Sequence, residues 1–315
     1  MSEINPELAE ETRAAPVSRP ERGGGEPFAA VRPRHSASVV MLLPLYVWTI
    51  LLVLLPMIYV LVLSFLTRSE TYGVQYVFTL SNYVRLAEPA NLNILGASLR
   101  MAVLTTLITL VIGYPFAYFM ARRPKKQRNL LLLLVIVPFW TSSLMRTYGW
   151  MLFLRSNGIL NNILMGLRLE GGPTKFLYNN GAVLFGMAYS FLPFMILPLY
   201  ASIEKLDKSI REAARDLGAN RYQAFMTVTV PLTMPGVVSG SMLVFVPSVG
   251  LFFISDLMGG SAHMVLGDLI SYYLQGGKDW PLGAVLSMVM VVLTFFTTSV
   301  YRKFASDGGG LGVFG

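Results

Sequence analysis

The chain has 315 residues, of which 54% are apolar and 13% are charged, about half the charged fraction of roughly 25% found in soluble domains. With a mean hydropathy of +0.57, this balance excludes a disordered, fibrous or nucleic-acid-binding chain and argues against an ordinary soluble enzyme. Cysteine is absent and only two histidines occur, which excludes disulfides, thiolate metal sites, a cysteine nucleophile and a histidine-built metal centre. The net charge of +8 fits a membrane protein whose basic residues set its topology.

Both ends of the chain differ in composition from the middle. Residues 1–37 are rich in proline, glycine and charges of both signs, so they bury too little apolar surface to offset their ordering entropy. We expect a disordered cytoplasmic tail there. It is not a signal peptide, because no apolar core follows directly on a short basic start. The glycine-rich segment 305–315 is expected to be a second, flexible tail.

Residues 38–304 are expected to form one transmembrane domain. A helix needs roughly 20 apolar residues to cross about 30 Å of hydrocarbon. Six stretches qualify, the third only if it extends toward residue 154, at about 39–66, 99–120, 130–145, 181–203, 236–254 and 283–301. Several contain internal prolines, which membrane helices tolerate and which predict kinks. The fold class predicted is therefore an all-α integral membrane protein with six transmembrane helices.

Basic residues predict the orientation of these helices. Seventeen of the 25 lysines and arginines lie in the N-terminal tail, the loops 121–128 and 204–235, and the C-terminal end. Six lie in the alternate loops. The positive-inside rule then places both termini and the two basic loops in the cytoplasm, with residues 67–98, 146–180 and 257–282 outside.

Signs of catalysis are missing from the sequence. It contains no phosphate-binding loop with the pattern G-x-x-x-x-G-K-[ST], no H-E-x-x-H zinc motif and no nucleophile elbow. Membrane acids are few, which disfavours a proton-relay pump. We expect a non-catalytic chain without a cofactor of its own, which takes energy for uphill transport from a partner.

The loop 204–235 carries the most informative pattern. Ile210, Ala213, Ala214 and Leu217 recur at the spacing of one helical face. Asp207 is suited to cap the start of this helix, Gly218 to end it in a left-handed conformation, and Asn220 to cap a second helix. The predicted shape is helix, glycine turn, helix. It suits insertion into a partner's groove, and equally an amphipathic loop lying on the bilayer.

This loop resembles the E-A-A-x3-G-x9-I-x-L-P motif of ABC-importer permeases. Glu212, Ala213, Ala214, Gly218 and Pro231 match its fixed positions, while Val228 and Val230 stand where isoleucine and leucine are usual. The resemblance implies the six-helix fold of type I importer permeases and a loop that docks into the cytoplasmic ATPase. It also implies that Glu212 pairs with a basic residue of the ATPase, that the two alanines permit close approach, and that Gly218 makes the turn.

A closer resemblance, over most of residues 40–300, is to the B-type permeases of spermidine/putrescine ABC importers. The segments that carry it are 64–68, 78–83, 113–117, 138–141, 202–208 and 255–260. It implies a second, C-type permease as the heterodimer partner, two cytoplasmic ATPase subunits and a periplasmic polyamine-binding protein, all assembled at the lipid bilayer of a bacterial inner membrane. ATP and Mg²⁺ are then expected in the ATPase, and no nucleic acid is involved.

A path for an oligocation needs carboxylates and aromatic faces. Asp256 follows Phe252 and Phe253 at the end of the fifth stretch, and Trp140 and Tyr148 lie near the outer end of the third. We predict these as pathway residues. Asp256 alternatively caps a helix or pairs with Arg146, and the aromatic residues alternatively form an interfacial belt. Asp268 and Asp279 are expected in an outer loop, solvated or facing the binding protein.

Other functions remain open to the sequence. Permeases for ferric iron, opines or thiosulfate share the coupling motif, so the solute is less firmly indicated than the mechanism. A self-contained secondary transporter or channel would need coupling acids or an inverted repeat, and a membrane enzyme would need a catalytic cluster; the sequence displays none of these.

Overall fold

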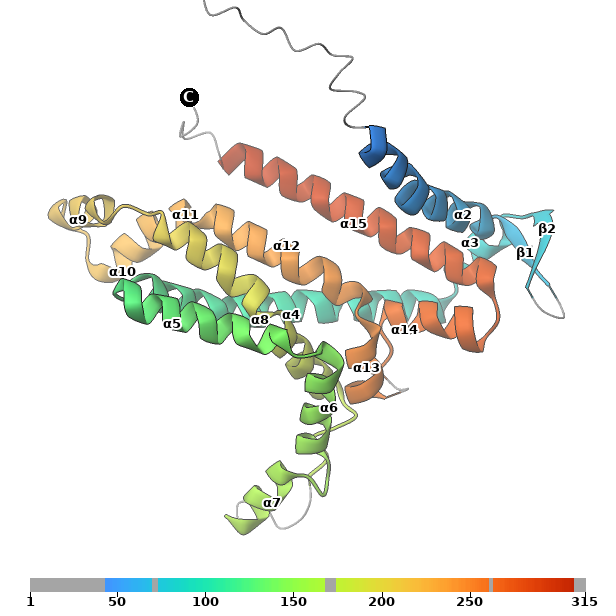
Figure 1. Cartoon of the computed structure of the whole chain (residues 1–315), viewed down its shortest axis with the longest axis horizontal. Coiled ribbons are helices and arrows are strands. Elements are labelled where there is room, and N and C mark those ends of the chain that lie inside the picture. Colours follow the sequence, from blue (N-terminus) through green and yellow to red (C-terminus); the bar gives the residue numbers. More distant parts are fainter. Residues whose placement is uncertain (1–42, 70–72, 168–173, 261–262, 309–315) are drawn as a thin grey trace, which may run out of the picture. The chain divides into compact units, whose positions relative to one another are not determined.

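The computed structural model describes residues 43–69, 73–167, 174–260 and 263–308 (Figure 1). The chain divides into two compact units at Leu55 and Pro56, and each is treated by itself. The tail expected at residues 1–37 lies outside the described residues. Of the tail expected at 305–315, residues 305–308 belong to the last helix and the rest lies outside the described part.

The described part of the first unit, residues 43–55, is helical and contains one π-helical turn, η2 (Ile50–Leu54). The chain continues as α2 (Leu55–Ser64). Together they form a helical stretch, Leu43–Ser64, that is long and apolar enough to cross a membrane. This corresponds to the first of the six predicted spans.

Three long helices form the centre of the second unit: α4 (Pro89–Ala121), α8 (Asn180–Glu204) and α12 (Met234–Gly250). Each packs against the other two. Their buried side chains include Met120, Met187, Met195 and Val244, all fully buried. Apolar residues on nearly every face of these helices explain their hydropathy, and small residues at the crossings let the backbones approach.

Two of the predicted spans are bent. The chain from Lys125 to Gly166 contains α5 (Lys125–Ile136), the 3₁₀ turn η3 (Val137–Trp140), α6 (Ser143–Leu154) and α7 (Ile159–Gly166), and its two halves meet at 91°. Pro138 lies in the turn, where its missing N–H and ring interrupt the α-helical ladder. The chain from Arg221 through α11 (Val230–Leu232) and into α12 bends by 62°.

Short elements lie at one end of this bundle. Strands β1 (Leu66–Arg68) and β2 (Val74–Phe78) pair antiparallel, with a register shift between Leu66 and Thr67, and are followed by α3 (Ser81–Leu86). After α12 come α13 (Phe252–Gly259), α14 (Leu266–Ser271) and the π-helical turn η5 (Tyr272–Gly276). The small hairpin is an addition to the all-helical fold that the sequence predicts.

The last helix, α15 (Trp280–Gly308), packs against α12, α14 and α3. Its start is anchored by Asp279, which is fully buried and lies 2.8 Å from Arg85 Nη2 and 3.5 Å from Arg68 Nη1. Two arginines around one carboxylate compensate the cost of burying it. This pairing joins the hairpin, α3 and α15.

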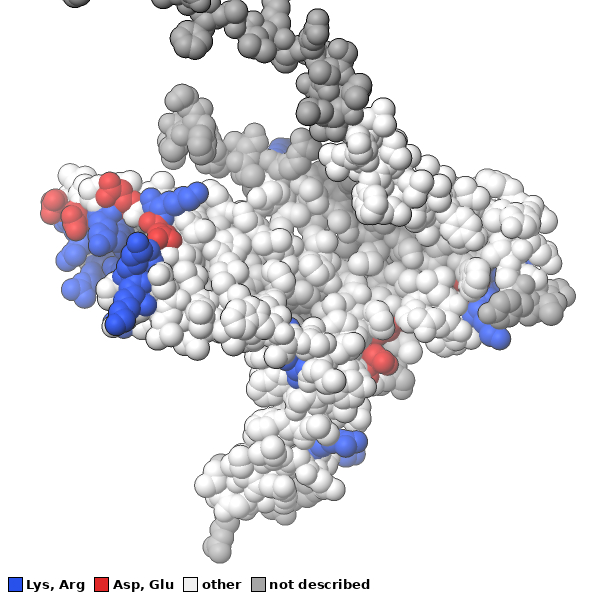
Figure 2. Space-filling model, viewed as in Figure 1, with Lys and Arg blue, Asp and Glu red and all other residues white. Residues whose placement is uncertain are grey.

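The described residues contain four continuous helices long and apolar enough to span a membrane, or up to six if each bent pair is one span. The larger count, six spans, agrees with the six apolar stretches predicted from the sequence. Large apolar side chains remain exposed along the helices, for example Val111, Phe295 and Phe296, as expected where the surrounding solvent is hydrocarbon. Charged side chains gather instead at the ends of the bundle (Figure 2).

Candidate functional site

The first candidate site is the loop between α8 and α12, which folds as the predicted helix, glycine turn and helix. Helix α9 (Lys208–Asp216) begins at Asp207, whose Oδ1 accepts a hydrogen bond from the Ser209 N–H at 3.0 Å. Gly218 has φ +92°. The Gly218 N–H donates to the Arg215 carbonyl at 2.9 Å and the Ala219 N–H to the Ala214 carbonyl at 3.1 Å, which is the Schellman pattern of a helix end.

The second helix of this loop is α10 (Arg221–Ala224), followed by the π-helical turn η4 (Phe225–Thr229). Asn220 caps it: its side chain accepts from the Gln223 N–H at 2.8 Å, while the Gln223 side chain accepts from the Asn220 N–H at 2.9 Å. This reciprocal pair is a capping box. Pro231 lies in the short helix that follows the π-helical turn, and it is exposed.

Helix α9 has its apolar face outward. Leu217 is 90% exposed, Ile210 is 44% exposed, Ala213 is exposed and Ala214 is half-buried. An amphipathic helix of a monomer normally packs its apolar face against the core. The reversed arrangement leaves an apolar stripe (Ile210, Ala213, Ala214 and Leu217) free to contact another molecule.

The opposite face of α9 is charged and borders a cavity of about 320 Å³. Lys208, Arg211, Glu212 and Arg215 line this cavity from α9, at the i, i+3, i+4 and i+7 spacing of one helical face. Glu212, predicted as the residue that contacts the ATPase, therefore has basic neighbours in its own chain. The structure places Gly218 and the two alanines beside it on the same short helix and turn.

The second candidate site is a cavity of about 730 Å³ bordered by α13, α14 and η5. Asp256 and Phe252 line it from α13, Asp268 from α14, and Tyr272 and Gln275 from η5. Two carboxylates and two aromatic rings thus converge, although they come from three elements. The break at Leu251 between α12 and α13 turns the chain here, and α14 then returns beside α13.

Asp268 is held in place by its own helix. Its Oδ2 accepts a hydrogen bond from the Val265 N–H at 2.7 Å in the first turn of α14. Burial raises the pKa of the Asp268 carboxyl to about 6; the hydrogen bond from Val265 opposes this shift, and the nearby Asp256 carboxylate adds to it. The Asp268 carboxyl therefore changes its charge near pH 6.

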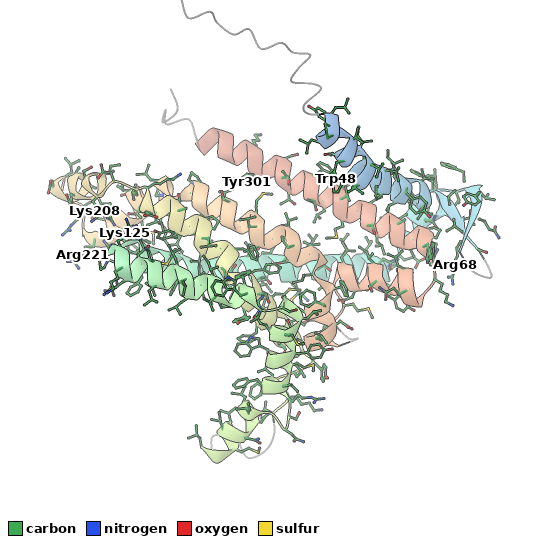
Figure 3. All side chains as sticks on the ribbon, in the orientation of Figure 1. Trp48, Arg68, Lys125, Lys208, Arg221 and Tyr301 are labelled. Atoms are coloured by element: carbon green, nitrogen blue, oxygen red, sulfur yellow. The ribbon has the colours of Figure 1, made fainter. Side chains whose placement is uncertain are left out.

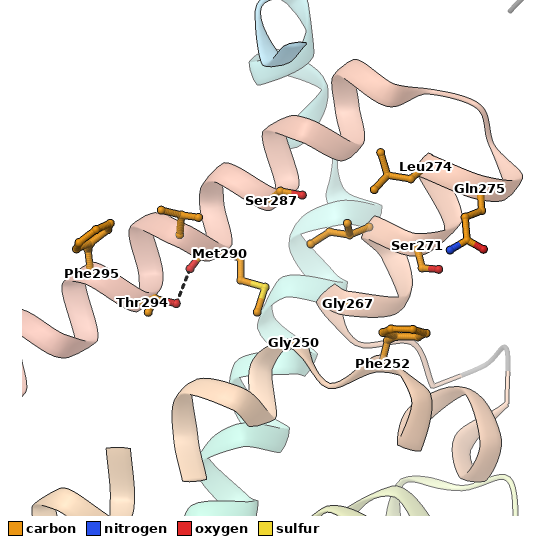
Figure 4. A pocket seen from close by; sticks show the side chains of 12 residues that line it. Gly250, Phe252, Gly267, Ser271, Leu274, Gln275, Ser287, Met290, Thr294 and Phe295 are labelled. Atoms are coloured by element: carbon orange, nitrogen blue, oxygen red, sulfur yellow. Dashed lines mark hydrogen bonds between the residues drawn. The ribbon is translucent and has the colours of Figure 1, made fainter. Parts of the chain in front are cut away.

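An apolar cavity of about 540 Å³ adjoins the acidic one (Figure 4). Phe252, Ser271 and Gln275 line both cavities. Met290 and Phe295 of α15 contribute to the apolar wall, and the Thr294 hydroxyl is turned back to the Met290 carbonyl at 2.9 Å. The acidic cavity and the apolar cavity are thus neighbours that share Phe252, Ser271 and Gln275 as a common wall.

The other predicted pathway residues do not line the acidic cavity. Phe253 is half-buried and packs against the main core, Trp140 is 78% exposed at the end of η3, and Tyr148 is exposed on α6. Arg146, considered as a partner of Asp256, instead places its guanidinium 5.3 Å from the Phe139 ring centre and 5.9 Å from that of Tyr189.

Asp268 and Tyr272 were missed as site residues by the sequence reasoning, which placed Asp268 in an outer loop, solvated or facing the binding protein. A signal was present in the spacing of Asp268 and Tyr272, which share one helical face at i and i+4. What the sequence did not reveal is the reversal between α13 and α14 that brings this face to Asp256.

Comparison with known proteins identifies the family. Residues 113–307 match the family described as binding-protein-dependent transport system inner membrane component. The spermidine/putrescine transport system permease protein PotB of Escherichia coli (strain K12) is 46% identical over 263 residues, which cover 84% of this chain and 96% of that protein. The protein of the same name from Haemophilus influenzae is 43% identical over 259 residues, covering 82% and 91%.

A solved structure supports the fold. A chain of a bacterial alginate ABC transporter, in complex with an alginate pentasaccharide-bound periplasmic protein, superposes with a TM-score of 0.70 at 19% identity and covers 86% of this chain and 96% of its own length. The fold is thus that of the type I importer permeases, as the coupling motif predicts. The chain belongs to the family of binding-protein-dependent transport system inner membrane components.

Proposed function

We propose that this chain is a permease subunit of an ATP-driven importer of polyamines such as spermidine and putrescine. The relatives that share 43–46% of its residues over more than four fifths of its length carry this function in their names. The chain itself is non-catalytic in this proposal. It forms half of the pathway with a second, C-type permease, receives solute from a periplasmic binding protein, and couples to two cytoplasmic ATPase subunits that hold ATP and Mg²⁺.

The outward apolar stripe of α9 supports coupling to the ATPase. A groove in the partner would bury Ile210 and Leu217, and the small side chains of Ala213 and Ala214 permit close approach. Gly218 holds the following helix at the angle that keeps the stripe free. In the complex Glu212 would reach from the charged face of this helix to a basic residue of the ATPase, and Pro231 marks the return of the loop to α12.

The observation that carries the choice of solute is the convergence of Asp256, Asp268, Phe252 and Tyr272 on one cavity. Ammonium groups are attracted to carboxylates and to aromatic faces, the latter by about 0.5–2 kcal/mol per contact. The adjoining apolar cavity then offers a surface to the methylene spacers. A polyamine alternates these two chemistries, whereas thiosulfate and other anions would be repelled by the two carboxylates.

Uptake of radiolabelled spermidine, normalised to the amount of assembled complex in the membrane, tests this proposal. Asp256→Asn keeps the side-chain shape and removes one charge, so we expect uptake at low spermidine to fall about tenfold, as for the loss of one charge-assisted contact. Asp268→Asn should act in the same direction. Glu88→Gln is the matched control, because Glu88 is an exposed carboxylate before α4 that lines neither cavity.

Replacement of Trp140, Tyr148 or Phe253 by leucine should reduce uptake less, because none of them lines the acidic cavity. Unchanged normalised uptake in Asp256→Asn would remove the cavity from the pathway. Competition by ferric iron or thiosulfate, with none by putrescine, would exclude a polyamine as the solute.

A further inference from the structure

The cavity beneath α9 gathers positive charge from three segments of the chain. Besides Glu212, its charged lining residues are five cations: Arg122, Lys208, Arg211, Arg215 and Arg221. They come from the end of α4, from α9 and from the start of α10. Figure 3 shows Lys208 and Arg221 at the same end of the bundle, where Figure 2 shows the densest cluster of basic side chains.

These cations are not compensated within the described part of the chain. None of the five has a carboxylate within 4.0 Å there, whereas Arg128, also at this end, lies 2.7 Å from Glu204 Oε1. Like charges held around one small cavity repel each other; Arg211 is half-buried, and the other four cations are exposed, so water screens part of their repulsion. One carboxylate, that of Glu212, cannot balance five cations.

Two buried polar atoms at this cavity also have no hydrogen-bond partner among the described residues: the Thr229 hydroxyl and Arg211 Nε. Thr229 is fully buried, and both residues line the cavity. Buried donors are nearly always satisfied in folded proteins. A hydroxyl and a guanidinium that border the same cavity are two donors for one acceptor-rich ligand.

Aromatic rings form one wall of the cavity. The Arg122 guanidinium lies 4.4 Å from the Tyr118 ring centre, and Tyr118 packs edge-on against Phe225 at 5.2 Å. Such a wall excludes water from one side and strengthens charge interactions inside. The volume of about 320 Å³ is at the small end of the range for ligand sites, which suits a small head group rather than a large molecule.

A general excess of basic residues at a cytoplasmic surface explains their number but not their convergence. Lys125 and Lys126 lie at the start of α5 and are exposed, and they do not line the cavity. The rule that basic residues gather on the inner side is satisfied equally by these lysines. Unlike these lysines, the cavity-lining cations lie around two buried donors, Arg211 Nε and the Thr229 hydroxyl, that have no hydrogen-bond partner among the described residues.

We propose that this cavity binds a phosphate-type oxyanion, with Arg211, Arg215 and the Thr229 hydroxyl as its main ligands. Guanidinium groups form paired hydrogen bonds with phosphate oxygens. The phosphate belongs either to an anionic phospholipid of the adjacent leaflet or to a soluble phosphate compound. Bound there, it joins α9 to α10 and the end of α4, and so holds the outward apolar stripe in a fixed orientation.

The test uses the full-length chain, purified with the subunits that accompany it, in nanodiscs of phosphatidylcholine with or without phosphatidylglycerol. Native mass spectrometry counts the phosphatidylglycerol molecules that the protein retains. Calorimetric titration with inorganic phosphate, in phosphatidylcholine discs, measures the binding of a soluble phosphate. Retention of phosphatidylglycerol identifies a lipid, and phosphate binding without retention identifies a soluble ligand. Either result supports the site.

Three variants make the test specific. Arg211→Gln combined with Arg215→Gln should weaken binding of phosphatidylglycerol or of phosphate, whichever the wild type binds, by at least about tenfold. Thr229→Val should weaken it by a smaller factor without unfolding the loop, because the hydroxyl has no partner to lose among the residues that the structure describes. Lys125→Gln combined with Lys126→Gln removes the same charge outside the cavity and should leave binding within about twofold of wild type.

If the Lys125 and Lys126 control weakens binding as much as the Arg211 and Arg215 variant does, the binding depends on general surface charge, and the proposal is overturned. Absence of both phosphatidylglycerol retention and phosphate binding in the wild type would overturn it as well. Binding that is present in the isolated permease and lost when the ATPase is bound would assign the cavity to an acidic side chain of the ATPase instead.

Discussion

Gly218 is the residue on which the orientation of α9 depends most directly. Its φ of +92° lies in the left-handed region, and no atom lies within 4 Å of the position that a Cβ would occupy. A side chain there meets no steric clash, so any effect of substitution comes from the backbone. For a residue other than glycine, this conformation costs about 1–2 kcal/mol.

We expect Gly218→Pro to abolish ATPase recruitment and uptake, because proline cannot adopt this φ and lacks the N–H that donates to Arg215. Gly218→Asn should have a small effect, since asparagine tolerates the left-handed region, and Gly218→Ala an intermediate one. The measurement is the amount of ATPase that copurifies per permease. Membrane insertion should be normal in all three, and wild-type recruitment by Gly218→Pro would refute the role of the turn.

Glu212 offers a second residue-scale test of coupling. Glu212→Lys would add a sixth cation to the basic cavity and present like charge to a basic residue of the ATPase, so we expect recruitment and uptake to be lost. Glu212→Gln removes the charge without reversing it and should be milder. The amount of ATPase that copurifies per permease is again the measurement. Equal recruitment by both variants and the wild type would exclude Glu212 from the contact with the ATPase.

The acidic cavity makes a prediction about pH. The pKa of Asp268 is raised to about 6, so its carboxylate is charged above that pH and becomes neutral below it. Uptake at low spermidine should therefore fall as the external pH drops from about 7.5 to 5.5. A bound ammonium favours the ionised form, so saturating spermidine should move this fall to lower pH.

Asp268→Asn separates this effect from a structural one. Because ionisation of a buried acid with a raised pKa costs stability above pH 6 and not at low pH, its replacement by the neutral amide should not reduce the amount of folded protein at neutral pH. Uptake by this variant should be low and nearly independent of pH from 5.5 to 7.5. A pH dependence as steep as in wild type would assign the titration to another group.

At the scale of elements, the contact between α12 and α8 rests on two glycines one helical turn apart. A Cβ at Gly236 would lie 2.5 Å from Ser202 Cβ and 2.9 Å from the Pro198 carbonyl oxygen, and one at Gly240 would lie 2.8 Å from the sulfur of Met195. This i, i+4 spacing of small residues is a common device for close helix packing in membranes.

We expect Gly240→Leu to separate the two helices and to destabilise the fold by about 1–3 kcal/mol or more, as overpacking does. Gly96→Ala is the control, because a Cβ at Gly96 of α4 meets nothing within 4 Å. The yield of monodisperse protein after detergent extraction measures the difference. A normal yield from Gly240→Leu would show that α12 can shift without loss.

The hydropathy of the chain predicts most of the elements and few of their bends. Runs of apolar residues locate the spans, because each must cover the same thickness of hydrocarbon. They do not reveal that α5 and α6 meet at 91°, since a span and a turned segment have the same composition. Capping residues were readable for a different reason: Asp207, Gly218 and Asn220 act on their own neighbours in sequence, whereas the Asp256–Asp268 pair depends on a reversal between helices.

At the scale of the whole molecule, charge separates the two ends of the second unit. Lys125, Lys208 and Arg221 lie at one end and Arg68 at the other (Figure 3). Basic side chains are dense at the end that carries α9 and α10, and sparse at the end that carries the β-hairpin and α14 (Figure 2). An excess of lysine and arginine marks the cytoplasmic side of a membrane protein. The positive-inside rule therefore predicts that the apolar stripe of α9 and the acidic cavity lie on opposite sides of the bilayer.

This separation predicts the topology of the chain. Reporter fusions at Arg123 and Lys208, in the two basic loops, should read as cytoplasmic, and one at Asn157, in the exposed turn between α6 and α7, should read as periplasmic. The physical reason is that short loops rich in lysine and arginine are retained on the inner side during insertion. Alkaline phosphatase and green fluorescent protein fusions at each position give opposite signals, which controls for expression. A periplasmic signal at Lys208 would put α9 out of reach of any cytoplasmic ATPase, and the proposed coupling would fall with it.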